Sequence, residues 1–222
     1  MSLTRSILLA LGGLVCVSLA GVVQASDSGT PGSNISGETG TTINGHEYVD
    51  LGLSVLWATC NVGANKPTEF GGYYAWGETS TKSSYTKENS ETQGKVLGDI
   101  GGTEFDVARA TWGGEWRMPT KAEFEELWEN TNFKVTTVND VWGLQLTSIK
   151  NGKTIFFPNA DYRDGTETQD IGGGFYWSST PDDNDATRAY FELYFLGSMR
   201  FDEWGNRYQG YSVRPVIAPA NR

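Results

Sequence analysis

A series of short apolar stretches after Asn130 constrains the fold more than any other feature of the chain. Each stretch is rich in aromatic or β-branched residues, as strands are, and glycine or polar residues separate one stretch from the next. The predicted strands are residues 143–149, 154–157, 174–177, 189–195, 198–201 and 211–216. The second half of the chain is therefore predicted to consist mainly of strands.

Two helices are predicted ahead of these strands. Residues 103–106 (TEFD) and 120–123 (TKAE) both fit the capping box, in which a hydroxyl accepts from the amide three residues on and the acid there bonds back. After the second box, Phe124, Leu127 and Trp128 recur with helical spacing. Strands are also expected at residues 46–51 and 55–58. Helices near the front and strands behind them predict an α+β domain.

The first 25 residues are predicted to be a signal peptide. Arg5 supplies a positive charge, residues 6–23 are apolar, and Val23-Gln24-Ala25 has the small-residue spacing of a cleavage site. An uncleaved membrane anchor is the alternative. Residues 26–44 are rich in Gly, Ser and Thr, which predicts a flexible linker, and a single domain is expected over residues 45–218. We therefore expect an exported protein, whether at the cell surface, in the periplasm or secreted.

Charge and cysteine content exclude some classes of protein. The formal net charge of -10 argues against a nucleic-acid partner, because phosphates require a basic surface. Aromatic residues at 13% together with 28 glycines predict a loop-rich fold held by large rings. Cys60 is the only cysteine after the predicted cleavage site, so no intramolecular disulfide is expected, and its neighbours indicate a buried thiol.

Several blocks of the sequence resemble the exported "major paralogous domain" proteins of gut and rumen bacteria. The resemblance spans residues 45–217, nearly all of the chain after the linker. Its blocks are residues 48–53 (YVDLGL), 57–63 (WATCNVG), 73–78 (YYAWGE), 116–124 (WRMPTKAEF), 157–158 (FP), 162–163 (YR), 176–180 (YWSST) and 212–216 (SVRPV).

The resemblance implies a C-type lectin fold of the formylglycine-generating-enzyme, or sulfatase-modifying-factor, type. Such a fold packs two helices on small twisted antiparallel sheets and builds a binding face from the C-terminal strands and loops. The enzymatic members use a pair of cysteines for copper binding and thiol oxidation. Because Cys60 is the only cysteine expected in the exported chain, formylglycine formation is not expected here.

The tail also resembles variable proteins that are diversified by retroelements. In those proteins a hypervariable segment begins near a YWSST block and ends near an SVRPV block. Residues 189–211 occupy that position here. The resemblance implies a displayed ligand-binding segment.

Residues 196–211 mix aromatic, acidic, basic and amide side chains without a period of 2 or 3.6, so they cannot all face one core. The sequence therefore predicts a ligand-binding surface in this segment. Trp204 among polar neighbours is typical of a binding hot spot. The predicted contact residues are Phe191, Arg200, Asp202, Glu203, Trp204, Asn206, Tyr208, Gln209 and Tyr211.

Other conspicuous residues are predicted to be structural. Arginines in the matched blocks are expected to bond to backbone or carboxylates, and acids in the first turns of a helix to serve capping. The arginines are Arg117, Arg163 and Arg214, and the acids are Glu123, Glu125 and Glu126. The tryptophans predicted to fill the core are Trp57, Trp76, Trp112, Trp116, Trp142 and Trp177.

No metal, cofactor or catalytic residue is predicted. Asp182, Asp183 and Asp185 offer oxygen ligands for calcium but lack the spacing of an EF-hand, so a solvated acidic loop with at most weak calcium binding is expected. His46 alone cannot form a metal site or a catalytic triad, and no nucleophile elbow or phosphate loop occurs.

The sequence thus predicts a non-enzymatic, exported domain that recognises a protein or a glycan. Two alternatives remain open. A degenerate or unusual enzyme of the formylglycine-generating-enzyme superfamily would be favoured by a pair of acids facing a deep pocket. A structural component of a surface assembly, such as a fimbrial tip, would be favoured by an exposed strand edge.

Overall fold

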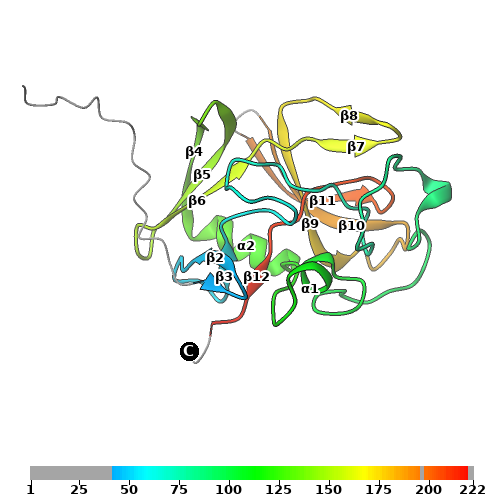
Figure 1. Cartoon of the computed structure of the whole chain (residues 1–222), viewed down its shortest axis with the longest axis horizontal. Coiled ribbons are helices and arrows are strands. Elements are labelled where there is room, and N and C mark those ends of the chain that lie inside the picture. Colours follow the sequence, from blue (N-terminus) through cyan, green and yellow to red (C-terminus); the bar gives the residue numbers. More distant parts are fainter. Residues whose placement is uncertain (1–41, 196–197, 220–222) are drawn as a thin grey trace, which may run out of the picture. The chain divides into compact units, whose positions relative to one another are not determined.

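The computed structural model describes residues 42–195 and 198–219 (Figure 1). The predicted signal peptide and the linker as far as residue 41 lie outside the described residues. The first described strand pairs residues 42 and 43 with the next one, so regular structure begins slightly before the predicted domain start. Among the described residues, no helix has the length and apolar character needed to cross a membrane.

Short strands dominate the described part of the chain, which also contains two α-helices and one 3₁₀ turn (Figure 1). The first half contains β1 (Thr42–Ile43), β2 (His46–Val49), β3 (Leu56–Ala58), η1 (Lys87–Asn89), α1 (Val107–Trp112) and α2 (Lys121–Glu129). The second half contains β4 (Thr131–Val138), β5 (Val141–Ser148), β6 (Thr154–Pro158), β7 (Tyr162–Asp164), β8 (Glu167–Gln169), β9 (Gly173–Pro181), β10 (Arg188–Phe195), β11 (Ser198–Asn206) and β12 (Val216–Ile217).

The predicted α+β class, with a C-type-lectin-like layout of two helices packed on sheets, is wrong. The structure is mostly β, with 38% of residues in strands and 11% helical, arranged as several small antiparallel sheets. The two predicted helices are present but short, since α1 has six residues and α2 has nine. Helices of about 9 and 14 Å, at 1.5 Å per residue, are too short to form a layer of their own.

The described strands form four sheets, with the strand orders β1-β2-β3-β12, β11-β10-β9, β4-β5-β6 and β7-β8. In the first, β12 near the C-terminus pairs with β3, with Val216 opposite Trp57 (Figure 1). In the second, β11 pairs only with β10, which makes it an edge strand among the described elements. The predicted strand over residues 211–216 is not a regular ladder: Tyr211 and Ser212 form isolated bridges, and Val216 begins β12.

The two helix starts differ in how they agree with the sequence. At α2 the box is confirmed, because the Thr120 side chain accepts from the Glu123 amide and Glu123 bonds back to the Thr120 amide. At α1 the box is wrong, because the N-cap is Asp106 and not Thr103. The Asp106 carboxylate accepts from the backbone amides of Gly102, Ala108, Arg109 and Met118. Burial raises the pKa of Asp106, and these four amides oppose that shift.

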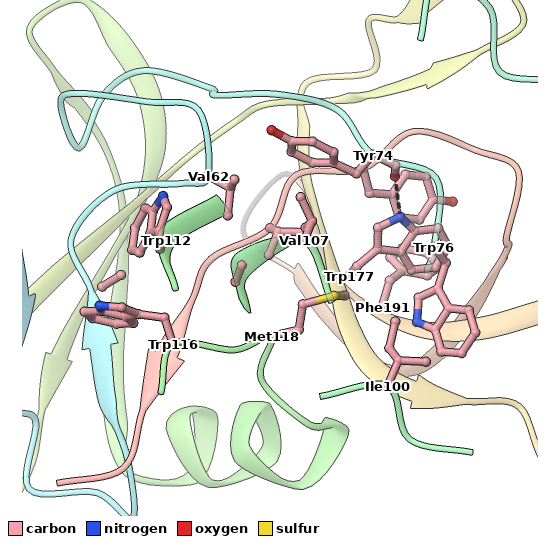
Figure 2. Close-up of a cluster of buried hydrophobic side chains, with 14 of the residues drawn as sticks. Val62, Tyr74, Trp76, Ile100, Val107, Trp112, Trp116, Met118, Trp177 and Phe191 are labelled. Carbon is pink, nitrogen blue, oxygen red and sulfur yellow. Dashed lines mark hydrogen bonds between the residues drawn. The ribbon is translucent and has the colours of Figure 1, made fainter. Parts of the chain in front are cut away.

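Large aromatic side chains fill the larger core cluster (Figure 2). Trp76, Trp116 and Trp177 are fully buried, and the Trp177 indole donates to the Tyr74 carbonyl at 2.8 Å. Met118 and Val107 lie between the Trp112 and Trp116 side and the Trp177 side of this cluster. The core prediction is thus confirmed for these tryptophans and for Trp57, which belongs to a second cluster with Phe124 and Leu127 of α2.

Trp142 is the exception among the tryptophans predicted to be core. Its side chain is 62% exposed, so its assignment to the core is wrong. Trp142 opens β5 next to the turn at Asn139 and Asp140, where the hairpin extends past the core. Apolar character alone therefore did not decide its burial.

The arginines in the matched blocks have the structural roles expected of them. Arg117 bonds to Glu123 and to the Met118 carbonyl, and Arg163 donates to the Thr166 carbonyl. Arg214 is fully buried; it donates to the side chain of Asn61 and to the carbonyls of Ala58 and Phe156. Its guanidinium also lies 4.4 Å from the centre of the Phe157 ring, and burial lowers its pKa.

Candidate binding surface

The antiparallel pairing of β10 with β11 decides which tail residues share a face. Side chains alternate along each strand, and directly opposed residues lie on the same face. Tyr190 is opposite Trp204 and Arg188 is opposite Asn206, so these four share the outer face. Phe191 is opposite Glu203 on the other face. The predicted contact set is therefore split between two faces of the sheet.

Trp204 is held in a defined position on the outer face. Its ring meets the Tyr190 ring edge-to-face, with centroids 5.8 Å apart, and the Arg188 guanidinium lies 5.2 Å from its centre. Lys121 at the start of α2 extends over Tyr190, with its ammonium 4.8 Å from the ring centre. Trp204 nevertheless remains 44% exposed. We call Lys121, Arg188, Tyr190, Trp204 and Asn206 the Trp204 surface.

Arg188 also explains the acidic loop that precedes β10. Its guanidinium forms ion pairs with Asp182 at 3.1 Å and with Asp185 at 3.0 Å. Asp185 accepts from the hydroxyl and the amide of Thr187. These bonds are the main cause that lowers the pKa of Asp185, and the charge of Arg188 lowers it further. Asp182 accepts from the Asn184 amide and is largely buried, so the prediction of a solvated loop holds only in part. At most weak calcium binding remains our prediction for Asp182, Asp183 and Asp185.

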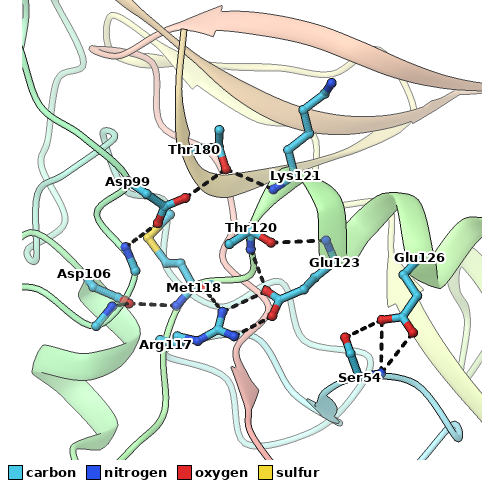
Figure 3. A network of polar contacts seen from close by, with 12 residues as sticks. Ser54, Asp99, Asp106, Arg117, Met118, Thr120, Lys121, Glu123, Glu126 and Thr180 are labelled. Atoms are coloured by element: carbon cyan, nitrogen blue, oxygen red, sulfur yellow. Dashed lines mark hydrogen bonds and ion pairs between the residues drawn. The ribbon is translucent and has the colours of Figure 1, made fainter. Parts of the chain in front are cut away.

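A network of polar contacts fixes the start of α2 beside the Trp204 surface (Figure 3). The Thr180 hydroxyl at the end of β9 accepts from the Lys121 amide and donates to Asp99 at 3.0 Å. Arg117 bonds to Glu123 at 2.8 Å in the same network. Lys121 also pairs with Glu125 at 3.1 Å. The backbone at Lys121 is thus held by Thr180 of β9 and by the capping box of α2.

Phe191 and Tyr211 are core residues and have to be removed from the predicted contact set. Phe191 is 7% exposed and Tyr211 is 3% exposed, and both belong to the larger core cluster. Tyr211 stacks on Trp177 with centroids 4.1 Å apart. A side chain on Gly205 would collide with the Tyr211 ring, which explains a glycine inside β11.

The turn after β11 lies against β7 and bonds to it. Gln209 donates to the Asp164 carboxylate at 2.8 Å and accepts from the Asn206 amide and the Tyr211 hydroxyl. Tyr208 is partly buried, and its pKa is raised by burial and then by Asp164. Gln209 therefore has a structural role that the sequence did not indicate, whereas Tyr208 still presents part of its ring.

Arg207 is an important tail residue that sequence reasoning missed. It is 1% exposed, and its guanidinium donates to the carbonyls of Lys95 at 2.7 Å and Arg188 at 3.0 Å. It also lies 4.2 Å from the centre of the Trp76 ring. Burial lowers its pKa, and Asp185 and Asp182 oppose that shift. The only signal for it in the sequence was its place between two aromatic-rich stretches.

Two further contact predictions concern residues whose side chains are not described. Arg200 and Asp202 lie within β11, with Arg200 opposite Leu193. Their roles as ligand contacts remain predictions. Glu203 is partly buried on the face that also carries Phe191.

The other residues weighed as functional candidates have packing partners. His46 stacks on Trp112 with ring centroids 3.7 Å apart, and burial lowers its pKa. Cys60 is half-buried rather than fully buried, and burial raises the pKa of its thiol. In the described ranges, no group of three or more His, Cys, Asp or Glu residues is arranged to hold a metal ion.

No family model, curated protein or solved structure matches the chain in a significant way. The resemblance to "major paralogous domain" proteins and to retroelement-diversified proteins therefore remains a prediction from the sequence.

Proposed function

We propose that this protein is an exported, non-enzymatic binding protein that contacts a protein or glycan ligand through the Trp204 surface. The observation that carries the proposal is Trp204, a large ring that remains 44% exposed while Tyr190 and Arg188 hold it in place. A positioned aromatic ring offers apolar area to a ligand at a low cost in conformational entropy.

The charges around Trp204 support a ligand that is bound mainly by apolar and hydrogen-bonding contacts. Arg188 is paired with Asp182 and Asp185, and Lys121 is paired with Glu125. Because carboxylates already neutralise both cations, a strongly anionic ligand would have to displace them. An aromatic ring rimmed by paired charges suits the face of a sugar or an apolar protein side chain.

The test is a screen followed by paired variants. The protein is applied to a glycan array and to a surface-displayed protein library, and each ligand found is measured again with Trp204→Ala. We expect affinity to fall at least about 30-fold, as for a binding hot spot, with a melting temperature within a few degrees of the parent. Phe70→Ala is the matched control, because Phe70 is also an exposed aromatic, at 41% against 44% for Trp204. Undiminished binding by Trp204→Ala would place the ligand elsewhere.

We further propose that the tail is diversified by a retroelement. The structure limits what such variation could change, since Gly205 and Arg207 are held by packing and Trp204 and Asn206 lie on the outer face. Sequencing the flanking DNA should reveal a near-copy of the tail that differs mostly at adenines, beside a reverse-transcriptase gene. Related copies should vary at Trp204 and Asn206 and keep Gly205 and Arg207; variation spread equally over all four would contradict this.

A structural role in a surface assembly is the second candidate function, because one observation favours it. Within the described sheets, β4 is an edge strand with exposed apolar side chains. For the enzyme alternative, the acids brought together near α2 are each held by structural partners: Asp106 by backbone amides and Glu123 by Arg117. Such bonding suits a structural role for these carboxylates.

A further inference from the structure

No strand among residues 42–195 and 198–219 pairs with the outer edge of β4 (Thr131–Val138). β4 belongs to the sheet β4-β5-β6, and among the described strands it pairs with β5 alone (Figure 1). The β4–β5 hairpin turns at Asn139 and Asp140, with φ of 47° and 63°, and Val138 is opposite Val141. Residues that flank such a two-residue turn bond to each other, so even-numbered residues of β4 bond to β5.

The odd-numbered residues of β4 consequently direct their amides and carbonyls away from β5. The Ile149 amide donates to the carbonyl of Asn130, an even-numbered residue just before β4, at 3.0 Å. This bond confirms that the even-numbered residues are the ones that bond to β5. The outward groups belong to Phe133, Val135 and Thr137. They have no hydrogen-bond partner within the part of the chain that the structure describes.

The face that these odd-numbered residues share also carries an exposed apolar row, made of Phe133 and Val135 of β4 and Trp142 of β5. Opposed residues share a face, which places Phe133 beside Leu146, Val135 beside Leu144, and Thr137 beside Trp142. Leu144 and Leu146 are buried in the second core cluster. Phe133 is 49% exposed, Val135 is 37% exposed and Trp142 is 62% exposed. The apolar face of the sheet thus extends from the core to the exposed edge strand. An exposed apolar face beside unpaired backbone groups favours pairing with another strand.

The charge of this hairpin favours a second copy of the chain as that strand. The chain as a whole has a net charge of -10, which opposes most contacts between copies. Residues 131–149 contain only two charges, Lys134 and Asp140, and are neutral overall. Two copies that paired through this hairpin would therefore experience little of that repulsion.

We propose that β4 pairs antiparallel with β4 of a second copy, about a two-fold axis at Val135. Outward groups must meet outward groups, so odd-numbered residues oppose odd-numbered residues. A two-fold axis at Lys134 would satisfy this rule but would set Lys134 against Lys134 of the second copy, which is unfavourable. The axis at Val135 avoids that contact.

The Val135-centred register also covers the exposed rings. It places Phe133 opposite Thr137 of the second copy, and Thr137 has Trp142 on its other side within its own hairpin. Each small threonine then lies between two large aromatic side chains, which shield it and each other from water. The two apolar rows join across a sheet of six strands, three from each copy. This proposal is independent of the Trp204 surface, which lies on another sheet.

Sedimentation velocity over a concentration series tests the proposal. The full chain, or its processed form if the host cleaves it, should sediment at twice its own mass, with a dissociation constant below about 10 µM. Val135→Lys, which sets two new charges against each other at the axis, should raise that constant at least about tenfold. Ile149→Lys is the control, because Ile149 is 59% exposed but lies outside β4, and it should leave the dimer unchanged.

Hydrogen exchange gives a second readout that needs no variant. The amides of Phe133, Val135 and Thr137 should exchange slowly at high protein concentration and quickly after dilution, whereas even-numbered amides of β4 should be protected at both. A chain that stays monomeric, or a dimer that survives Val135→Lys and leaves these three amides unprotected, would overturn the proposal.

Discussion

Arg207 provides the sharpest test of the structure, because the tail in which it lies was predicted to be surface. Its guanidinium is buried, donates to the carbonyls of Lys95 and Arg188, and lies over Trp76. Arg207→Met keeps an apolar stem of similar length on Trp76 and removes every donor. The substitution therefore isolates the hydrogen bonds and the charge from the packing.

The expected cost follows from the groups left behind. The carbonyls of Lys95 and Arg188 lose hydrogen bonds of 2.7 Å and 3.0 Å. Each buried carbonyl left without its donor costs about 1–3 kcal/mol. The lost contact between guanidinium and indole adds about 1 kcal/mol. Removing a buried charge relieves its desolvation, which offsets part of this loss. We expect the free energy of unfolding to fall by about 3 kcal/mol, a large share of the about 5–15 kcal/mol of a typical domain.

Chemical denaturation followed by tryptophan fluorescence measures this difference. Arg109→Met is the matched control, since Arg109 is 41% exposed and makes only a 3.4 Å ion pair with the exposed Glu115. The control should change the free energy of unfolding by less than about 0.5 kcal/mol. If Arg207→Met and Arg109→Met unfold at the same denaturant concentration, the burial of Arg207 and the packing of the tail on Trp76 would be refuted.

Three further predictions concern the core. Trp177→Ala should lower the free energy of unfolding by about 3–5 kcal/mol in the same assay, and a parent-like curve would contradict its fully buried position. Burial raises the pKa of Tyr176 to about 12, while an unfolded tyrosine ionises near pH 10. Its contribution to stability should therefore be constant below about pH 10 and be lost between about pH 10 and 12, which denaturation at stepped pH would show; an unchanged stability across that range would refute it. Gly174→Ala should destabilise by at least about 1–3 kcal/mol, because the new Cβ would lie 2.1 Å from the Tyr194 ring, whereas Gly98→Ala, with nothing within 4 Å, should not.

Helices and strands whose local sequence signal has a single interpretation were predicted correctly. The capping box at Thr120 begins α2, and Phe124 and Leu127 enter the core at helical spacing. The strongly apolar strands β6, β9 and β10 lie where their side-chain pattern placed them. In each case the apolar residues that define the sequence pattern are also the residues that become buried, so the pattern predicts the element correctly.

The edge strand β4 was not predictable in the same way. β4 was missed because most of its side chains are exposed, so its apolar residues Phe133 and Val135 are too few to define a period. Trp142 was assigned to the core because a large ring usually is buried, yet its strand runs past the core. Whether a strand lies at an edge depends on the order of strands in the sheet, which no local pattern records.

The irregular pattern of the tail has a different cause from the one inferred from the sequence. The absence of a period predicts an exposed segment, but in the structure neighbouring residues have different roles, some in the core and some at the surface. Trp204 faces outward beside Tyr190, Gly205 gives room to the Tyr211 ring, and Arg207 supplies donors to buried carbonyls. A segment can thus lack periodicity because it is partly core and partly surface. Only its outward residues can change without loss of stability, and the binding function we propose has to reside in them.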